Sequence, residues 1–310
     1  MIRIGISGWT YTPWRGVFYP KDLPQKRELE YASRQFNSIE INGTFYSLQR
    51  PTSYQTWYEQ TPDDFIFSLK GSRYLTHMLK LKNPEKPLAN FFASGVLCLK
   101  EKLGPILWQF PAMLGFDPDR FENFFKLLPR DTQAAAELAK KHDTRLKGRA
   151  YTKSDKKRPI RHAVEFRHDS FLVPEFVQLL RKHKIAMCFA DTAQTFPYAE
   201  DLTADFCYLR LHGPEILYVS GYTDSALQWW SQRIRAWSQG SQPPDARLIT
   251  PTPPKPRKSR DIYAYFDNDV KVRAPADAAT LSKLLGLIPT PTQNSKSQIS
   301  IPKQAPSSKL

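Results

Sequence analysis

Charged and polar side chains alternate with apolar ones in several short β-rich runs. In NSIEIN, Glu40 and Asn42 alternate with isoleucines, and in HAVEFR, Glu165 and Arg167 alternate with valine and phenylalanine. Side chains at every second position of a strand lie on one face. If the runs end at one mouth of a sheet, the polar residues of this parity form a ring of mixed charge: Ser7, Glu40, Asn42, Ser68, Lys70, Gln109, Glu165, Arg167, Tyr208, Arg210, His212 and Asp267.

The positive members of this ring suit the binding of a small anion. Lys70, Arg167 and Arg210 carry ammonium and guanidinium groups, which pair with phosphate and carboxylate oxygens. We expect a phosphorylated or nucleotide-like substrate there. Further substrate contacts are expected from polar side chains of the ring and of two loops: Asn42, Gln109, Asp267, Tyr11 and Tyr46.

Two carboxylates and one histidine of the ring supply the groups that proton transfer requires. We expect Glu165 and Glu40 to act as base and acid, and His212 to orient or shuttle a proton. In the structural alternative the charges only fix geometry, with Glu165 paired to Arg167 and Glu40 paired to Lys70. The number of strands that contribute favours a ligand site.

Aromatic residues cluster in the loop after the first predicted strand, GWTYTPWRGVFYP (8–20). Such residues can stack on a base or a sugar, or can pack as a lid. We expect Trp14 and Phe18 to pack. Tyr11 and Tyr46, whose hydroxyl groups require polar neighbours, are expected to stack on the substrate.

Histidine is scarce in the ring, and this limits metal binding. The three cysteines lie in apolar runs without CxxC spacing, and His212 is the one histidine of the ring. Because zinc, manganese and iron centres need several imidazole, thiolate or carboxylate ligands, we predict no metal and no other cofactor. Glu40, Glu165 and Asp267 leave room for a weakly held Mg²⁺. A metal-dependent barrel nuclease or sugar isomerase is therefore one alternative function.

Eight strand-like runs position these residues. They span 2–7, 37–42, 65–70, 105–110, 162–167, 185–190, 206–212 and 261–266, and amphipathic stretches separate several of them. Parallel strands need crossover connections, so the alternation predicts an α/β fold with a parallel sheet. Eight units predict a closed (β/α)8 barrel of TIM type, with the ring at its carboxyl-end mouth. The alternative is an open, doubly wound sheet, which no GxGxxG after the first run supports.

The chain is expected to form one domain with two excursions and a tail. Residues 1–288 would be the barrel. Residues 137–161 begin like a helix and are expected to continue as a mobile loop, and residues 240–260 carry six prolines, which disfavour helix and central strand. Residues 289–310 are rich in Pro, Ser, Thr, Gln and Lys and are predicted to be disordered.

The net charge of +15 equals the charge of three segments: residues 137–161, residues 247–260 and the tail. Residues 137–161 hold ten Lys/Arg against three acids, and residues 247–260 hold five against none. The first alternative function, ahead of the metal-dependent barrel, is therefore a nucleic-acid-binding module that combines these basic segments with aromatic loops. We expect these basic segments to make only weak, nonspecific contact with nucleic acid. The sequence does not determine the oligomeric state.

Cellular location follows from what the sequence lacks. The first residues, MIRIGISG, have no basic segment followed by a long apolar one, and no apolar run approaches the length needed to span a bilayer. The cysteine pattern indicates a reducing compartment. We expect a cytoplasmic protein without membrane contact.

Seven segments, taken in order, resemble the blocks of the YecE-like family, also called domain of unknown function 72. They are GISGWTYTPWRGVFYP, EINGTFYSLQRP, TPDDFIFSLKGSRYLTH, LGPILWQFP, VEFRHDSF, YLRLHG and YAYFDNDVKVRAPADAATL, and together they cover about residues 1–287. The resemblance implies a bacterial, cytosolic (β/α)8 barrel and assigns no reaction.

The family pattern matches many residues of the ring. The matching positions are Glu40, Asn42, Thr44, Phe45, Tyr46, Lys70, Thr76, His77, Gln109, Glu165, Arg167, His168, Arg210, His212, Gly213, Asn268 and Asp269. Two features depart from the pattern. FDND stands where an FNND-like run is commoner, and both excursions are longer than in compact members.

Overall fold

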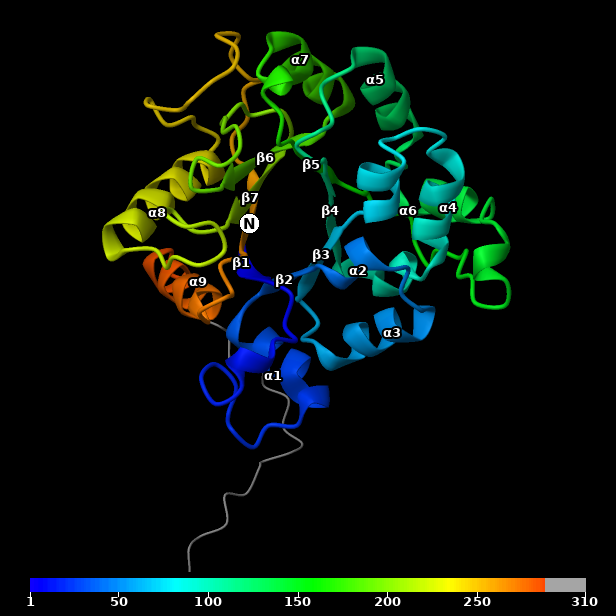
Figure 1. The fold of residues 1–310 in the computed structure, drawn as a ribbon, viewed down its shortest axis with the longest axis horizontal. Helices are drawn as coiled ribbons and strands as arrows, with labels where there is room; N and C mark the ends of the chain where they lie inside the picture. Colours follow the sequence, from blue (N-terminus) through cyan, green and yellow to red (C-terminus); the bar gives the residue numbers. More distant parts are fainter. Residues whose placement is uncertain (288–310) are drawn as a thin grey trace, which may run out of the picture.

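The computed structural model describes residues 1–287, in which eight parallel strands close into a barrel (Figure 1). Each strand pairs with the next along the chain, and the last pairs with the first. This confirms the predicted (β/α)8 barrel and excludes the open sheet. The predicted disordered tail lies outside the described residues. The strands are β1 (Ile2–Ser7), β2 (Ser38–Ile41), β3 (Ile66–Lys70), β4 (Leu103–Gln109), β5 (His162–Glu165), β6 (Ala186–Asp191), β7 (Phe206–Leu211) and β8 (Asp261–Phe266).

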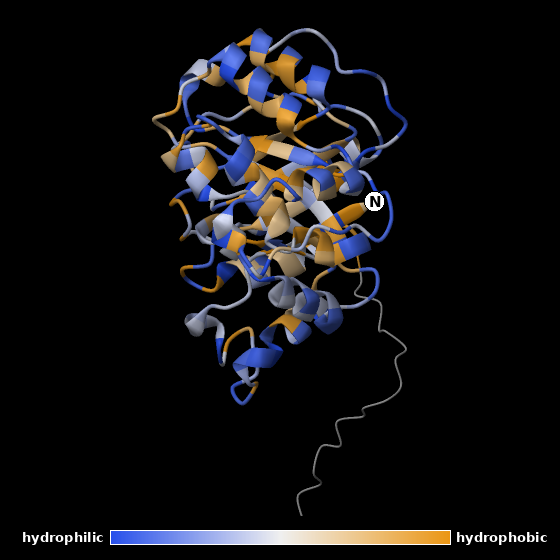
Figure 2. Ribbon diagram, turned by 90° about the vertical axis from the view of Figure 1, so that its right-hand side faces the viewer, coloured by the Kyte–Doolittle hydropathy of each residue, from blue (hydrophilic) through white to orange (hydrophobic). Residues whose placement is uncertain are grey.

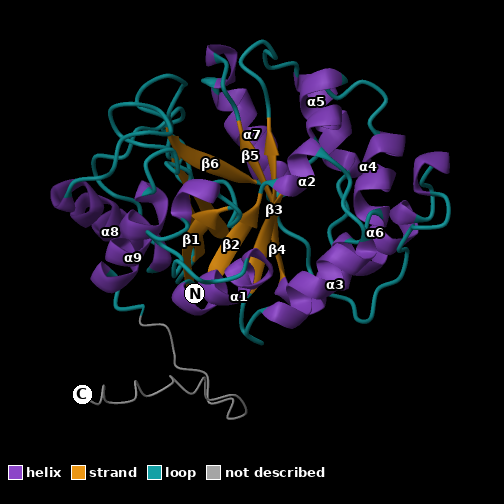
Figure 3. Ribbon diagram, turned by 60° about the horizontal axis from the view of Figure 1, so that its bottom comes forward, coloured by secondary structure: helices purple, strands orange, loops and turns teal. Residues whose placement is uncertain are grey.

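Helices surround the barrel and cover its outer face (Figures 1 and 3). Within residues 1–287, none is long and apolar enough to cross a membrane. Short 3₁₀ or π-helical turns, named η, occur in several connections. The helices are α1 (Glu28–Gln35), α2 (Gly43–Tyr46), α3 (Pro51–Gln60), α4 (Glu85–Ala93), α5 (Pro118–Leu127), α6 (Thr132–Ala139), α7 (Pro174–His183), α8 (Asp224–Ser238) and α9 (Arg273–Leu284).

Helix α7 illustrates how the sequence specifies these elements. It begins at Pro174, whose fixed φ suits the first helical position, and ends before Lys184, which has a left-handed φ of 51°. Its buried residues, Phe176, Val177 and Leu180, recur at helical spacing. This single apolar stripe faces the barrel and leaves the charged residues outside.

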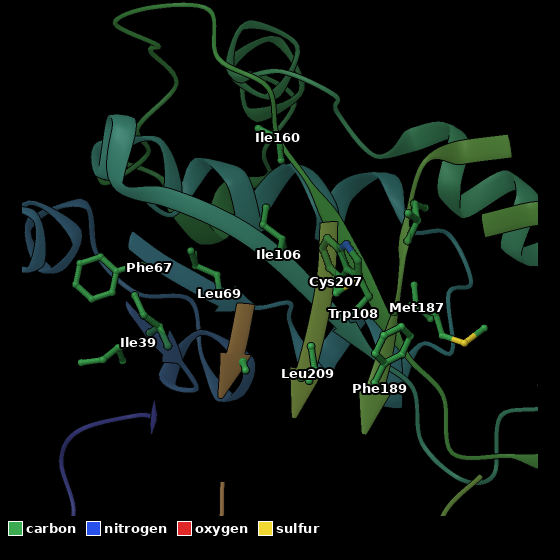
Figure 4. Close-up of a cluster of buried hydrophobic side chains, with 14 of the residues drawn as sticks. Ile39, Phe67, Leu69, Ile106, Trp108, Ile160, Met187, Phe189, Cys207 and Leu209 are labelled. Carbon is green, nitrogen blue, oxygen red and sulfur yellow. The ribbon is translucent and has the colours of Figure 1, made fainter. Parts of the chain in front are cut away.

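Strand parity separates two layers of side chains. Ile39, Leu69, Trp108 and Leu209 belong to the core between the strands and the helices, which Figure 4 shows in close-up. In Figure 2 much of the hydrophobic colour lies in the strands at the centre, while the surrounding helices and loops also carry much hydrophilic colour. A smaller cluster of alternate parity fills the inside of the barrel with side chains from β4 to β8: Leu107, Ala163, Ala186, Cys188, Ala190, Phe206, Tyr208, Tyr263 and Tyr265.

The first basic excursion is anchored, in contrast to the mobile loop expected for it. Helix α6 ends at Ala139, and the chain then returns along α4. Leu146, one of few apolar residues in this charged run, is fully buried. The backbone amide of Tyr151 donates to Ala93 O at 2.8 Å, and Thr132 Oγ1 donates to Lys156 O at 2.6 Å.

The Pro-rich excursion is irregular, as predicted, and covers a gap in the helical layer. The connection from β6 to β7 (residues 192–205) contains no helix. Residues 247–250 lie against it: Glu200 N donates to Arg247 O at 2.8 Å, and Ile249 N donates to Asp201 Oδ2 at 2.7 Å. The excursion thus takes the place of a covering helix.

Candidate functional site

Arg210 lies at the centre of the predicted ring. It projects from β7 into the barrel, is fully buried, and contacts three carboxylates. Nη2 lies 2.9 Å from Glu40 Oε1 and 2.6 Å from Asp267 Oδ2, and Nη1 lies 2.9 Å from Glu165 Oε2. These carboxylates come from β2, β5 and the residue after β8, so the predicted inward parity of the strands is confirmed.

Glu40 has no exposed surface, and both of its oxygens are engaged. Ser7 Oγ donates to Oε1 at 2.5 Å and Tyr208 OH donates to Oε2 at 2.6 Å, in addition to the contacts from Arg210. The Glu40–Lys70 pair of the structural alternative is not formed, because Arg210 takes its place.

Both carboxylate oxygens of Glu165 also accept hydrogen bonds, and Glu165 lies closer to the mouth of the barrel than Glu40. Its Oε1 accepts from Gln109 Nε2 at 2.6 Å and from Arg167 Nε at 2.8 Å. Burial raises its pKa, but the positive charges of Arg167 and Arg210 outweigh burial and hold the pKa well below the usual range. Glu165 is therefore a carboxylate at neutral pH, and the Glu165–Arg167 pair of the structural alternative is present.

His212 is fully buried beside Arg210 and Asp267. Arg210 Nη1 lies 3.2 Å from Nε2, while Nδ1 lies 3.1 Å from Asp267 Oδ2 without hydrogen-bond geometry. Burial and the Arg210 charge lower the pKa of His212, so its imidazole is neutral at pH 7. Burial raises the pKa of Asp267, but the Arg210 charge brings it below its usual value.

Lys70 ends β3 at the mouth and is only 7% exposed. Its Nζ lies 4.3 Å from the centre of the Phe45 ring. Among residues 1–287, no carboxylate lies at ion-pair distance from Nζ and no oxygen accepts a hydrogen bond from it. Burial and the Arg210 charge lower the pKa of Lys70 to about 8, although three nearby carboxylates oppose the shift.

Arg167 provides the second cation near the mouth, with 15% of its side chain exposed. Besides its contact with Glu165, its Nη2 donates to Tyr218 OH at 3.2 Å, and its guanidinium carbon lies 4.5 Å from the centre of the Phe196 ring. Both aromatic residues come from irregular connections after β6 and β7. Sequence reasoning missed them because such connections carry no periodic signal.

His77, one of the positions that match the family pattern, lies near Lys70: its ring meets the Phe45 ring edge-on at 5.1 Å between centres, and Lys70 Nζ lies over that same Phe45 ring. It lies in a π-helical turn, η3 (Tyr74–Met78), of the kind that often occurs at functional sites. Burial and the charges of Lys70 and Arg167 lower its pKa to about 4. Its position in the connection directly after β3 was the available signal.

The remaining predicted residues lie less centrally. Tyr11 is partly buried and its hydroxyl donates to Ser7 O at 2.6 Å. Asn42 follows β2, and its buried Oδ1 has no partner among the described residues. Tyr46 is 72% exposed and contacts Phe45 edge-on, so the structure does not bring it to the charged cluster. Trp14 is fully buried, as expected for a packing role.

The donor set around Arg210 is poor in metal ligands. Within the described part of the chain, no group of three or more His, Cys, Asp or Glu side chains is arranged to hold a metal ion. The three carboxylates converge on a guanidinium instead. The absence of a cofactor remains a prediction.

The sequence matches one family almost from end to end. A family model described as "Protein of unknown function DUF72" matches residues 3–300. The UPF0759 protein YecE of Escherichia coli O157:H7 is 25% identical over 247 residues, covering 78% of this chain and 84% of that protein. The UPF0759 protein YunF of Bacillus subtilis strain 168 is 28% identical over 116 residues, covering 36% of this chain and 40% of that protein. These matches confirm the resemblance seen in the motifs.

Two solved structures share the fold. A DUF72 family protein from Thermotoga maritima MSB8 superposes with a TM-score of 0.66 at 25% identity, covering 92% of this chain and 99% of that chain. A DUF72 family protein from Enterococcus faecalis V583 has a TM-score of 0.67 at 16% identity, covering 93% and 96%. The second likeness concerns the fold alone.

Proposed function

We propose a function from the site itself, because this chain belongs to the DUF72 family, whose model is described as a protein of unknown function. The proposal is an enzyme that performs acid–base or phosphoester chemistry on a small anionic substrate at the carboxyl-end mouth of the barrel. The observation that carries it is Lys70, a nearly buried ammonium group without an acceptor among the described residues. A ligand that supplies oxygen atoms offsets the lost hydration of such a group.

Lys70 and Arg167 are assigned to the anion. Both charges act on His77, which supports their facing one space. Arg210 was expected to bind the anion as well, but it is fully buried among three carboxylates. We therefore assign to Arg210 the positioning of those carboxylates.

Proton transfer is assigned to Lys70. A catalytic acid or base works best with a pKa near the working pH, and the pKa of Lys70 is about 8. The low pKa of Glu165 makes it a weak base, so its proposed part is to orient Arg167. Glu40, expected as the acid, would instead position Arg210, and His212 would contact the other side of the same Arg210 guanidinium.

No specific observation favours either alternative function. The nucleic-acid alternative combined aromatic loops with the basic excursions, but Trp14 is buried and Phe18 stacks on Phe36 at 5.8 Å. The excursions at 137–161 and 240–260 cover other flanks of the barrel. The metal-dependent alternative lacks a clustered ligand set within residues 1–287.

A thermal-shift screen against sugar phosphates and nucleotides tests the proposal. We expect stabilisation that survives in Glu165→Gln and disappears in Arg167→Ala, with Arg161→Ala, at the opposite end of the barrel, as the matched control. Affinity should fall as the pH rises through about 8, because Lys70 then loses its charge. If no such compound stabilises the protein at millimolar concentration, the proposal fails.

A further inference from the structure

Two lysines are buried in this barrel, and they differ in what their amines contact. Lys102 is 2% exposed, and its Nζ donates to Tyr58 O at 2.6 Å, Thr61 O at 2.8 Å and Thr61 Oγ1 at 3.2 Å. An ammonium group has three donors, so Lys102 is fully satisfied. Lys70 is 7% exposed, its Nζ lies 4.3 Å from the centre of the Phe45 ring, and within the described chain this Nζ makes no hydrogen bond or ion pair. No acceptor of the described chain therefore holds its amine.

The backbone around Lys70 is held in place. Thr44 Oγ1 donates to Lys70 O at 2.7 Å and to Ile41 O at 2.9 Å, which ties the ends of β3 and β2 together. Gly71 follows directly, and a Cβ at this position would lie 2.3 Å from the Trp108 ring. The chain therefore leaves β3 along a fixed path that directs Lys70 into the mouth.

The surroundings of Lys70 favour a neutral amine. Arg210 is permanently charged and acts on Lys70 together with burial, which brings the pKa to about 8. At pH 7 roughly a tenth of such an amine is neutral, compared with well under a hundredth for an exposed lysine. Only the neutral form carries the lone pair that attacks a carbonyl carbon.

We propose that Lys70 is a covalent nucleophile that forms an imine with an aldehyde or ketone substrate whose anionic group is bound by Arg167. This inference rests on the proposed function and specifies its substrate class. Arg167 has its Nε and Nη2 directed to Glu165 and Tyr218, which orients the guanidinium next to the mouth. We expect a carbonyl compound that carries a phosphate or a carboxylate to reach both residues, because the charges of Lys70 and Arg167 both act on His77.

The chemistry of the step balances without a further reactant. The Nζ lone pair forms a bond to the carbonyl carbon while the carbonyl π pair moves to oxygen. The resulting carbinolamine loses that oxygen together with the two hydrogens of the neutral amine as one water, which leaves a C=N bond. The imine then withdraws electrons from the neighbouring carbon, which prepares it for proton loss or C–C cleavage.

Trapping with a carbonyl probe tests the inference. The full chain is incubated at pH 7 with pyridoxal 5′-phosphate, reduced with borohydride to convert the imine to a secondary amine, and mapped by peptide mass spectrometry. We expect labelling at Lys70 to be at least about tenfold faster than at the exposed Lys157, and none at Lys102. Lys70→Arg should abolish the fast adduct, and Arg167→Ala should slow it.

Labelling of Lys70, Lys157 and Lys102 is compared within the unsubstituted protein, so the test stays valid even if a variant fails to fold. Labelling of Lys70 no faster than Lys157 overturns the inference, and if sugar phosphates still stabilise the protein, the proposed function survives. Fast labelling of Lys70 in a protein that no anion stabilises supports the nucleophile and contradicts the proposed anion site.

Discussion

Cations at the end of the barrel where the strands begin have acceptors within the described chain, whereas one cation at the end where the strands finish has none. At the first end, Arg161 lies 2.7 Å from Asp261 and 3.2 Å from Asp205, and Lys102 donates to three oxygens. At the second end, Arg210 is matched by three carboxylates, but Lys70 has no acceptor among the described residues. The same residue types are thus paired at one end, while at the other end one of them has no acceptor within the described chain.

The largest expected effect on stability comes from replacing Arg210, the central cation at the end of the barrel where the strands finish. Arg210→Met removes the buried cation that three carboxylates share, although Glu165 keeps its ion pair with Arg167, and should lower the free energy of unfolding by about 3–5 kcal/mol. Arg161→Met breaks pairs whose side chains are 28% and 25% exposed for Arg161 and Asp261, so we expect a loss of no more than about 1 kcal/mol. Urea denaturation measures both. Equal losses would remove the distinction between the two ends.

The second expected effect is on the pH dependence of stability, which should differ between variants of the two buried lysines. The pKa of Lys70 lies near 8 in the folded chain and near 10.5 when exposed, so between these values the unfolded chain binds more protons and stability rises with pH. Lys70→Met should lack this rise and be more stable at pH 7, by up to about 3 kcal/mol.

The matched control is Lys102→Met, which leaves three oxygens without their donor and should destabilise the protein at pH 7. Guanidinium denaturation from pH 7 to 10 gives both curves. A Lys70→Met variant that is less stable at pH 7 would show that the charge of Lys70 is compensated after all.

A smaller effect concerns the exposed basic excursion. Replacing Lys141, Lys147 and Lys153 by Gln should reduce the salt dependence of any binding to duplex DNA, with a slope change of up to about 0.9 for each phosphate that is no longer neutralised. Stabilisation by small anions should stay unchanged. These substitutions avoid deleting the anchored segment that holds Leu146. A steep slope that survives them would place the nucleic-acid contact elsewhere.

The smallest expected effect is that of metal removal. Because three carboxylates already meet Arg210, dialysis against a chelator should leave the melting temperature unchanged. Elemental analysis of protein purified without a metal-affinity tag should find no stoichiometric zinc, manganese or iron. Retained metal that is lost on replacing Glu165 would overturn the metal-free site.

Sequence periodicity predicts which side chains face the inside of the barrel, but it does not predict their partners. The face of a strand on which a side chain lies follows from its position in the local alternation. Glu40, Glu165 and Arg210 could therefore be placed on the inner face from the sequence. Glu40 pairs with Arg210 and not with Lys70 because the Arg210 side chain extends across the inside of the barrel from β7 to β2. No local pattern encodes that distance.

Side chains from irregular segments escaped prediction for a related reason. Phe196 and Tyr218 reach Arg167 from connections without periodicity. Leu146 anchors an excursion whose charge favoured a loop, because one buried apolar side chain can hold a short segment. Composition describes the average of a segment and does not identify such single contacts.

The Pro-rich excursion also has a consequence for the order of folding during synthesis. The connection after β6 contains no helix. Glu200 and Asp201 in this connection form hydrogen bonds with the backbone of residues 247–250, which are synthesised later. Phe189 of β6 likewise packs on Trp237 of α8, at 4.9 Å between ring centres. A nascent chain that ends at β7 therefore leaves this side of the barrel bare. Closure by β8 and the covering of β6 both require residues that follow β7, so we expect them to form late, after most of the domain has been synthesised.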